Sequence, residues 1–88
     1  MKLIFSQVAW TQYVDWQEED RKTLRRINAL VKDILRSPFQ GIGKPEPLKH
    51  EWSGWWSRRI DQEHRLVYRV TGTGDAQMLE IAQCRHHY

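Results

Sequence analysis

Apolar residues recur at helical spacing through the second quarter of the chain. Members of this stripe lie three or four positions apart, as one face of a helix requires: Leu24, Ile27, Leu30, Val31, Ile34 and Leu35. A shorter set between Ala9 and Trp16 follows the same spacing and is rich in aromatic rings. Ser6 and Asp20 precede the two segments as N-cap residues, and the second segment ends before Pro38, because proline disfavours helical angles in the residue before it. The pattern predicts two helices that each pack an apolar face inward.

The remaining apolar runs favour strands. They are short and rich in β-branched and aromatic residues, and they cover residues 2–5, 55–60, 64–70 and 78–82. Residues 39–47 contain two glycines and two prolines, which predicts a loop that belongs to no helix or strand. The prolines partly fix the backbone of this loop. One strand, two helices and then antiparallel strands indicate an α+β fold with both helices on one sheet face. At 88 residues, we expect a single domain spanning residues 1–88.

Alternation within residues 65–70 divides that strand between two faces of the sheet. Leu66, Tyr68 and Val70 form the core-facing set, and Arg65, Val67 and Arg69 form the other. No further part of the chain is left to cover the second face. We therefore expect it to be open and basic.

The register of the hairpin decides which residue lies beside Arg65. A two-residue loop would pair Ile60 with Glu63, whereas a three-residue loop would pair Ile60 with His64 and bring Arg59 opposite Arg65. The second register is preferred because it puts Ile60 on the core face. Two adjacent arginines are unfavourable unless an anion bridges them, so the pair is a candidate phosphate site. The alternative is that these arginines pair with nearby acidic side chains.

Charge and cysteine content narrow the class of protein. Lys and Arg number 14 against 11 Asp and Glu, a formal charge of +3, and the basic residues crowd residues 21–36 and 44–69. This is compatible with a nucleic-acid partner, although many basic proteins have none. The single Cys84 allows no internal disulfide, and no long apolar run is present. We expect a cytoplasmic protein that does not enter a membrane.

Some polar residues could together cleave RNA without a metal. That reaction needs a base for the 2'-hydroxyl, a cation for the phosphorane and an acid for the leaving 5'-oxygen. Glu46 lies between two prolines and near Lys44 and Lys49, and is a candidate base, although a loop glutamate is usually just solvated. Arg65 and Arg59 are candidates for the cation.

The C-terminal residues Cys84 to Tyr88 include two histidines followed by a tyrosine. Imidazole exchanges protons near neutral pH, and a tyrosine ring can stack on a base. The same residues could equally be a frayed terminus. His86 and His87 could be metal ligands, but we find no third and fourth ligand at suitable spacing, so neither a metal nor another cofactor is expected.

At this point the chain resembles a known family, the YoeB branch of the RelE toxins. The resemblance runs essentially end to end and is carried by residues 1–6, 16–18, 37–39, 43–50 (Gly-Lys-Pro-Glu-Pro-Leu-Lys-His), 56–60 and 63–68. It implies a RelE-like α+β ribonuclease fold and a toxin that cuts messenger RNA in the ribosomal A site. It also implies a partner antitoxin similar to YefM or Phd and operator DNA bound only through the toxin-antitoxin complex, and it is compatible with a homodimer.

The resemblance also implies roles for individual residues. Glu46 would be the general base, Arg65 the phosphate-stabilising residue, His87 the general acid and Tyr88 an orienting group. Lys44, Lys49 and Arg59 would be RNA contacts. The products would be a 2',3'-cyclic phosphate and a 5'-hydroxyl.

The chain departs from the family pattern in two places. The turn at residues 71–76 looks longer, which should alter only a surface loop. His86 stands where an aromatic or other residue is expected, so the tail offers two candidate acids; counting back from Tyr88 selects His87, and an extended tail would aim His86 elsewhere. Three alternatives are a non-catalytic nucleic-acid-binding corepressor, a ribosome-independent ribonuclease and an inactive toxin, but every matched catalytic position holds a chemically competent residue.

Overall fold

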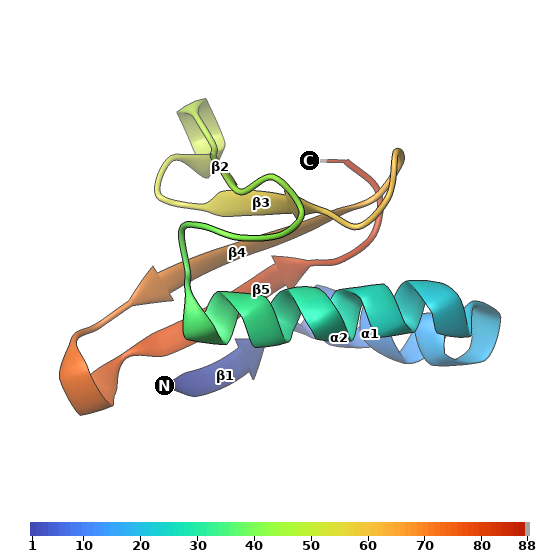
Figure 1. Ribbon diagram of the computed structural model, residues 1–88, viewed down its shortest axis with the longest axis horizontal. Coiled ribbons are helices and arrows are strands. Elements are labelled where there is room, and N and C mark those ends of the chain that lie inside the picture. The colour runs from blue at the N-terminus through green and yellow to red at the C-terminus, as the bar shows by residue number, and fades with distance from the viewer. Residues whose placement is uncertain (88) are drawn as a thin grey trace.

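The computed structural model describes residues 1–87 and contains two long helices and five strands. The chain runs through β1 (Lys2–Phe5), α1 (Gln7–Glu19), α2 (Arg21–Arg36), β2 (Glu46–Pro47), β3 (Trp56–Arg59), β4 (Arg65–Thr71) and β5 (Met78–Gln83). Two single turns of 3-10 helix lie in the connections, η1 (His50–Trp52) and η2 (Gly74–Ala76). Figure 1 shows α1 and α2 side by side along one side of the strands.

Both helices begin and end where the sequence predicts. The Ser6 side chain accepts a hydrogen bond from the Ala9 amide, and the Asp20 carboxylate accepts bonds from the Lys22 and Thr23 amides. The Thr23 side chain also donates to Asp20, and these bonds hold the pKa of that carboxyl below its usual range. Each cap supplies an acceptor to helix amides that have no intrahelical partner.

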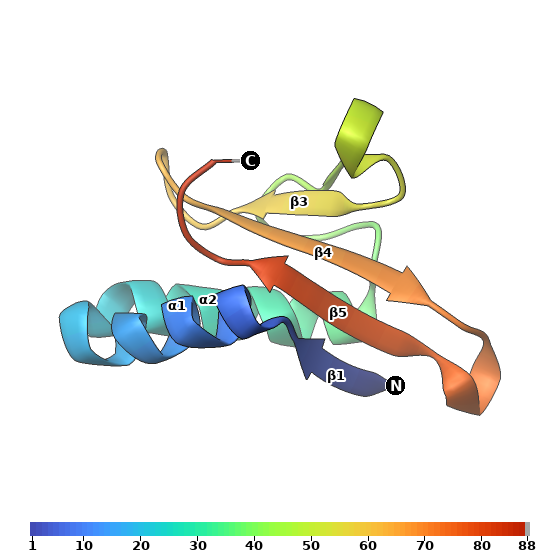
Figure 2. The same ribbon diagram turned by 180° about the vertical axis from the view of Figure 1, so that it is seen from behind.

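The sheet has the order β1-β5-β4-β3-β2. β1 pairs with β5 in parallel, and the other neighbours are antiparallel. Figure 2 shows β4 and β5 from the opposite side, with the segment after β5 curving past the start of β4. The predicted α+β architecture with both helices on one sheet face is confirmed.

The core lies between the helices and the sheet. Its fully buried members include Ala9, Ile27, Leu30, Ile34, Leu66, Tyr68, Leu79 and Ile81. Three residues expected in this core are exposed instead: Leu35 by 38%, Trp10 by 50% and Val14 by 37%. Leu35 is at the edge of the stripe, and Trp10 stacks with Tyr13 at a centroid distance of 5.9 Å at the rim of the core. Within the described residues, neither helix has the length and apolar character needed to cross a membrane.

Candidate active site

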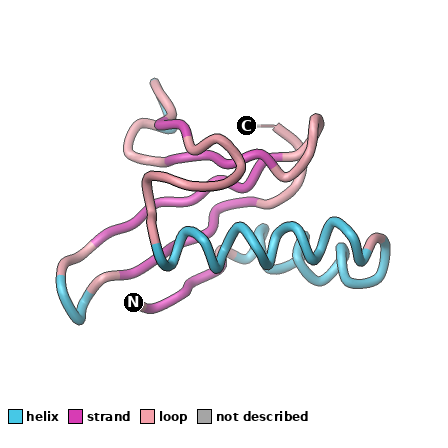
Figure 3. Tube along the Cα trace, in the orientation of Figure 1, coloured by secondary structure: helices cyan, strands magenta, loops and turns pink. Residues whose placement is uncertain are grey.

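A buried arginine holds the loop that carries Glu46. Figure 3 shows this loop, residues 37–45, crossing from the end of α2 to the outer strands. Arg58 of β3 is fully buried, and its guanidinium donates to the backbone carbonyls of Ser37, Gln40 and Ile42 at 2.7, 2.8 and 3.1 Å. The loop thus takes its shape from one side chain inside the fold.

Asp33 of α2 completes the charge balance of this buried group. Its carboxylate accepts hydrogen bonds from Arg58, from the Ile42 amide and from Arg36. These bonds, the one from Arg58 foremost, hold the pKa of Asp33 below its usual range. Tyr68 accepts from Arg58 Nε at 3.2 Å and donates to the Pro38 carbonyl at 2.6 Å. Burial raises the pKa of Tyr68, so its hydroxyl keeps the proton that it donates.

Glu46 lies in a strand, which corrects the expectation of a loop through residue 47. The two residues of β2 pair with β3, Glu46 opposite Ser57 and Pro47 opposite Trp56. Ser57 in turn lies opposite Val67 of β4. Because directly paired residues project to the same face of a sheet, these pairings fix the face on which Glu46 projects.

The arginine pair lies on that same face, two residues further along each strand. Arg59 is opposite Arg65, as the three-residue loop predicts, and this register is confirmed. Arg65 Nη1 donates to the carbonyls of Asp61 and His64 at 2.7 and 3.0 Å. Within residues 1–87, neither arginine has a carboxylate within ion-pair distance. The alternative of pairing with nearby acidic side chains is therefore wrong for the described residues.

Two other expectations for this face are wrong. Val67 is completely buried, and its partner Ser57 is also buried. Both residues lie outside the core on the helix side of the sheet. Arg69 is engaged: it pairs with Glu80 at 3.0 Å, and its guanidinium carbon lies 4.4 Å from the centre of the Trp55 ring. Strand alternation assigns a side to these residues but does not reveal what the connecting segments cover. The basic surface is consequently concentrated at Arg59 and Arg65.

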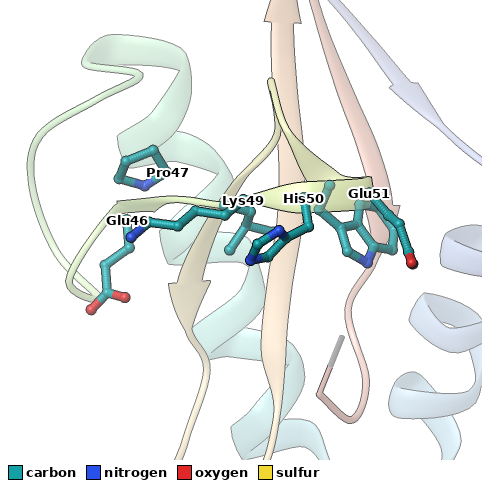
Figure 4. A pocket seen from close by; sticks show the side chains of 7 residues that line it. Glu46, Pro47, Lys49, His50 and Glu51 are labelled. Atoms are coloured by element: carbon teal, nitrogen blue, oxygen red, sulfur yellow. The ribbon is translucent and has the colours of Figure 1, made fainter.

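Glu46 borders a hollow of about 580 Å³ that is lined by residues 46–52. Figure 4 shows Glu46 and Glu51 at opposite ends of this lining, with Lys49 and His50 between them. Lys44 Nζ lies 3.6 Å from Glu46 Oε1, and the Glu46 side chain is 47% exposed. Glu46 is thus a solvent-reachable carboxylate among cations. The described lining of this hollow does not include Arg59, Arg65 or His87, so Glu46 borders it without these candidates.

The C-terminal tail is fastened residue by residue. The Cys84 amide donates to Gln12 at 2.7 Å, and its carbonyl accepts from Trp16 Nε1 at 2.9 Å. Arg85 pairs with Glu19 at 2.8 Å and lies over the Trp16 ring. Burial raises the pKa of the Cys84 thiol to about 12, which makes it a poor nucleophile at neutral pH. The alternative of a frayed terminus is wrong up to this point of the chain.

The last two described residues return to the sheet. The His86 amide donates to His64 Nδ1 at 2.7 Å, and the His86 carbonyl accepts from the Arg65 amide at 3.0 Å. The His87 carbonyl accepts from Gln83 Nε2 at 3.4 Å, and the residue itself is exposed. His86 has a φ of 64°, so the tail is not extended there and strict alternation does not apply. Tyr88 lies outside the described residues.

The fold adds a group of side chains that the spacing argument omits. Glu63, His64 and His86 each offer a ligand atom, and these atoms lie within 4.8 Å of one another. The expectation that no further metal ligands lie near the tail histidines is therefore wrong for His86. His87 is not a member of this group.

Three residues that organise this region were not predicted from the sequence as site residues: Arg58, Asp33 and His64. The sequence does contain features from which the burial of Arg58 and Asp33 could have been predicted. Alternation from Ile60 puts Arg58 on the core face, and Asp33 interrupts the apolar stripe between Leu30 and Ile34. A buried arginine needs an acidic partner, so the two residues could be paired from sequence. Nothing in the local pattern around His64 shows that it accepts the tail.

Comparisons with known proteins decide the family. The sequence profile of the YoeB-like toxins of bacterial type II toxin-antitoxin systems matches residues 5–88. The toxin YoeB of Escherichia coli (strain K12) is 58% identical over 88 residues, which is 100% of both chains. This chain belongs to the YoeB toxin family.

Solved structures agree with this assignment. A YoeB/ParE toxin from Agrobacterium tumefaciens superimposes with a TM-score of 0.96 at 51% identity, over 100% of both chains. Staphylococcus aureus YoeB, solved as a dimer and in a heterotetrameric YoeB-YefM complex, gives a TM-score of 0.86 at 44% identity in each case, over 100% of this chain and 98% of that one. The RelE-like toxin fold expected from the sequence is confirmed. The chain is a YoeB-type toxin of a type II toxin-antitoxin system.

Proposed function

We propose that this YoeB-family toxin is a ribosome-dependent endoribonuclease that cuts messenger RNA in the A site without a metal. The observation that carries the proposal is the strand register. It puts Glu46 on the same sheet face as Arg59 and Arg65, while the tail that carries His87 is hydrogen-bonded through His86 to Arg65, the first residue of β4. We infer that the base, the phosphate-binding pair and the acid act together around this one open face.

The face is wide enough to hold a nucleotide. Glu46 is on β2 and Gln83, which holds the His87 carbonyl, is on β5, three strands away. At about 4.8 Å between strands, the two backbones are roughly 14 Å apart. Side chains that reach inward from both edges leave room for one phosphate and its ribose. An open face of this kind is suited to an RNA strand that the ribosome holds in place.

In the proposed reaction, Glu46 removes the proton of the 2'-hydroxyl, and the 2'-oxygen attacks the adjacent phosphorus. Arg65, assisted by Arg59, stabilises the extra charge of the phosphorane through paired N–H donors. The bond from phosphorus to the 5'-oxygen breaks as the imidazolium of His87 protonates that oxygen. The products are a 2',3'-cyclic phosphate and a 5'-hydroxyl.

Three further residues have supporting roles in this proposal. Lys44 and Lys49 flank Glu46 in sequence, and both side chains are exposed, so they can contact RNA phosphates. Tyr88 would orient the RNA by stacking on a base. The reaction would take place in the cytoplasm, where ribosomes and messenger RNA are found.

A YefM-like or Phd-like antitoxin is the proposed protein partner, and the resulting complex would bind operator DNA. The S. aureus relative is found with YefM and also as a dimer. On this chain, apolar side chains of β1 and α1 are unusually exposed: Leu3 43%, Val8 58% and Trp10 50%. Leu3 and Trp10 also line one hollow, and an exposed apolar patch of this kind is suited to a protein-protein interface. A homodimer is proposed on the same grounds.

The ribosome requirement can be tested with purified protein and one end-labelled transcript. We expect cutting, mapped by primer extension, when the transcript is held in a translating ribosome, and none on naked RNA. Equal cutting of naked RNA would make the protein a ribosome-independent ribonuclease. No cutting in either case, with operator binding retained in the antitoxin complex, would favour the non-catalytic corepressor.

A further inference from the structure

A group of nitrogen and oxygen ligands lies beside the proposed cleavage face. Glu63 and His64 belong to the end of the β3–β4 turn, and His86 is brought to them by the returning tail. His64 Nε2 is 3.8 Å from Glu63 Oε1, and the two imidazole centres are 5.5 Å apart. We propose that Glu63, His64 and His86 bind a divalent transition-metal ion of the zinc class.

The distances fit a site that closes by side-chain movement together with release of the His86 amide hydrogen bond to His64. Zinc takes nitrogen and oxygen ligands at about 2.0–2.2 Å, so tetrahedral neighbours are roughly 3.3 Å apart. The ligand atoms here are within 4.8 Å of one another, so the widest separation has to close by about 1.5 Å to reach that spacing. Glu63 has a side chain 71% exposed and His86 is exposed, so both can rotate.

His64 is the fixed member of the group. Its side chain is 10% exposed and packs edge-on against Trp16 with a centroid distance of 5.0 Å. Its amide donates to Asp61 Oδ1 at 2.7 Å, which holds the backbone. One rigid imidazole and two side chains that can rotate are suited to binding a metal ion, since the two movable ligands can adjust to the geometry that the ion requires.

The ligand types indicate which ions fit. Two imidazole nitrogens and one carboxylate oxygen suit Zn²⁺ or Cu²⁺, whereas Mg²⁺ and Ca²⁺ prefer oxygen ligands alone. Three protein ligands leave a coordination position for water.

Metal binding would change how the tail is held. A neutral imidazole carries one N–H, and because His64 Nδ1 accepts from the His86 amide, the proton is on Nε2. A metal ion can bind Nε2 only in the other tautomer, in which the ring proton is on Nδ1 and Nε2 has a free lone pair. Nδ1 then no longer accepts the hydrogen bond from the His86 amide. The tail would thus lose the hydrogen bond from the His86 amide and be held instead by the bond between the metal ion and the His86 imidazole. This site does not depend on the proposed RNA cleavage.

The test uses full-length protein without a polyhistidine tag, titrated calorimetrically with zinc chloride. His86→Asn and Glu63→Gln each remove one ligand. Matched controls are His50→Asn, since His50 and His86 share a positive φ of 57° and 64°, and Glu18→Gln on the exposed side of α1. We expect one equivalent of Zn²⁺ on the wild type, binding at least ~10-fold weaker in the two ligand variants, and no change in the controls. Zinc should also shift the amide resonance of His86.

Three results would overturn the proposal. The first is a wild type that takes up no Zn²⁺. The second is a ligand variant that binds as tightly as the wild type. The third is an equal loss in His50→Asn, which would indicate scattered binding to surface histidines. The His86 amide signal also reports whether each variant keeps the folded tail, so a misfolded variant is recognised directly.

Discussion

At the scale of single residues, the guanidinium of Arg58 joins parts of the chain that are far apart in sequence. It connects β3 to Asp33 of α2 and to three carbonyls of the loop that leads to Glu46. A fully buried charge of this kind is stable only while every donor has an acceptor. The proposed general base therefore owes its position to a residue that never meets substrate.

The Arg58→Lys substitution should test this dependence. Lysine keeps the charge, but its single ammonium group cannot reach the same set of acceptors. We expect a loss of about 3 kcal/mol in the free energy of unfolding, measured by urea denaturation. Arg36→Lys is the control, since Arg36 also bonds Asp33 but its side chain is 82% exposed, and we expect a loss below ~1 kcal/mol. Equal losses in the two variants would remove the special role of Arg58.

Asp33 gives the fold a defined response to acid. Its pKa is lowered in the folded state, first by the hydrogen bond from Arg58 and then by that from the Ile42 amide. A lowered carboxyl pKa stabilises the fold fully above the unfolded value, near ~4, and that contribution is lost as pH falls through the folded value. We expect urea midpoints to drop below about pH 4 in the wild type and to change less in Asp33→Asn. The same acid dependence in both proteins would assign it to other carboxylates.

At the scale of elements, the order of strands and helices follows from the sequence because apolar spacing, caps and turns are local features. The hairpin register could also be predicted, since only one register keeps Ile60 on the core face. The short strand β2 and the burial of Val67 could not, because both depend on where connecting segments fold in space. The attachment of the tail could not be predicted for the same reason: its hydrogen-bond partners Gln12, Trp16 and His64 are remote in sequence.

The loop after α2 offers a test at this scale. Gly41 has a φ of 123°, and a Cβ there would come within 2.0 Å of Asp33 Oδ2. Gly54 also has a positive φ, 94°, but a Cβ would meet nothing within 4 Å. Gly41→Ala should therefore lose about 1–3 kcal/mol more than Gly54→Ala in the same urea measurement, because only the first forces the Arg58–Asp33 group apart. Equal losses would mean that backbone strain alone accounts for the effect.

At the scale of the whole molecule, α1, β4 and the C-terminal tail form one connected unit. Cys84 reports on it, because the residue is fully buried where the tail crosses α1 and its thiol pKa is raised to about 12. An unfolded cysteine has a pKa near ~8.5, so its reactive thiolate forms at mild pH only when the unit opens.

We expect native Cys84 to resist a thiol reagent at pH 8 and to react at once in concentrated guanidinium. The logarithm of the labelling rate under native conditions should fall in proportion to any added free energy of unfolding, because the rate follows the population of the open form. A rapid native reaction would show that the tail detaches on its own, which would contradict the fastening described here.

The most direct test of the account is the single-turnover rate of messenger RNA cleavage on programmed ribosomes. Glu46→Gln and His87→Asn should each slow cleavage by at least ~100-fold, since each removes one proton-transfer group. Glu51→Gln, at the far end of the hollow that Glu46 borders, and His86→Asn should remain within ~3-fold of wild type, because neither lost group takes part in proton transfer. Wild-type rates in both Glu46→Gln and His87→Asn would contradict the proposed chemistry, and a loss confined to His86→Asn would assign the acid to the other histidine.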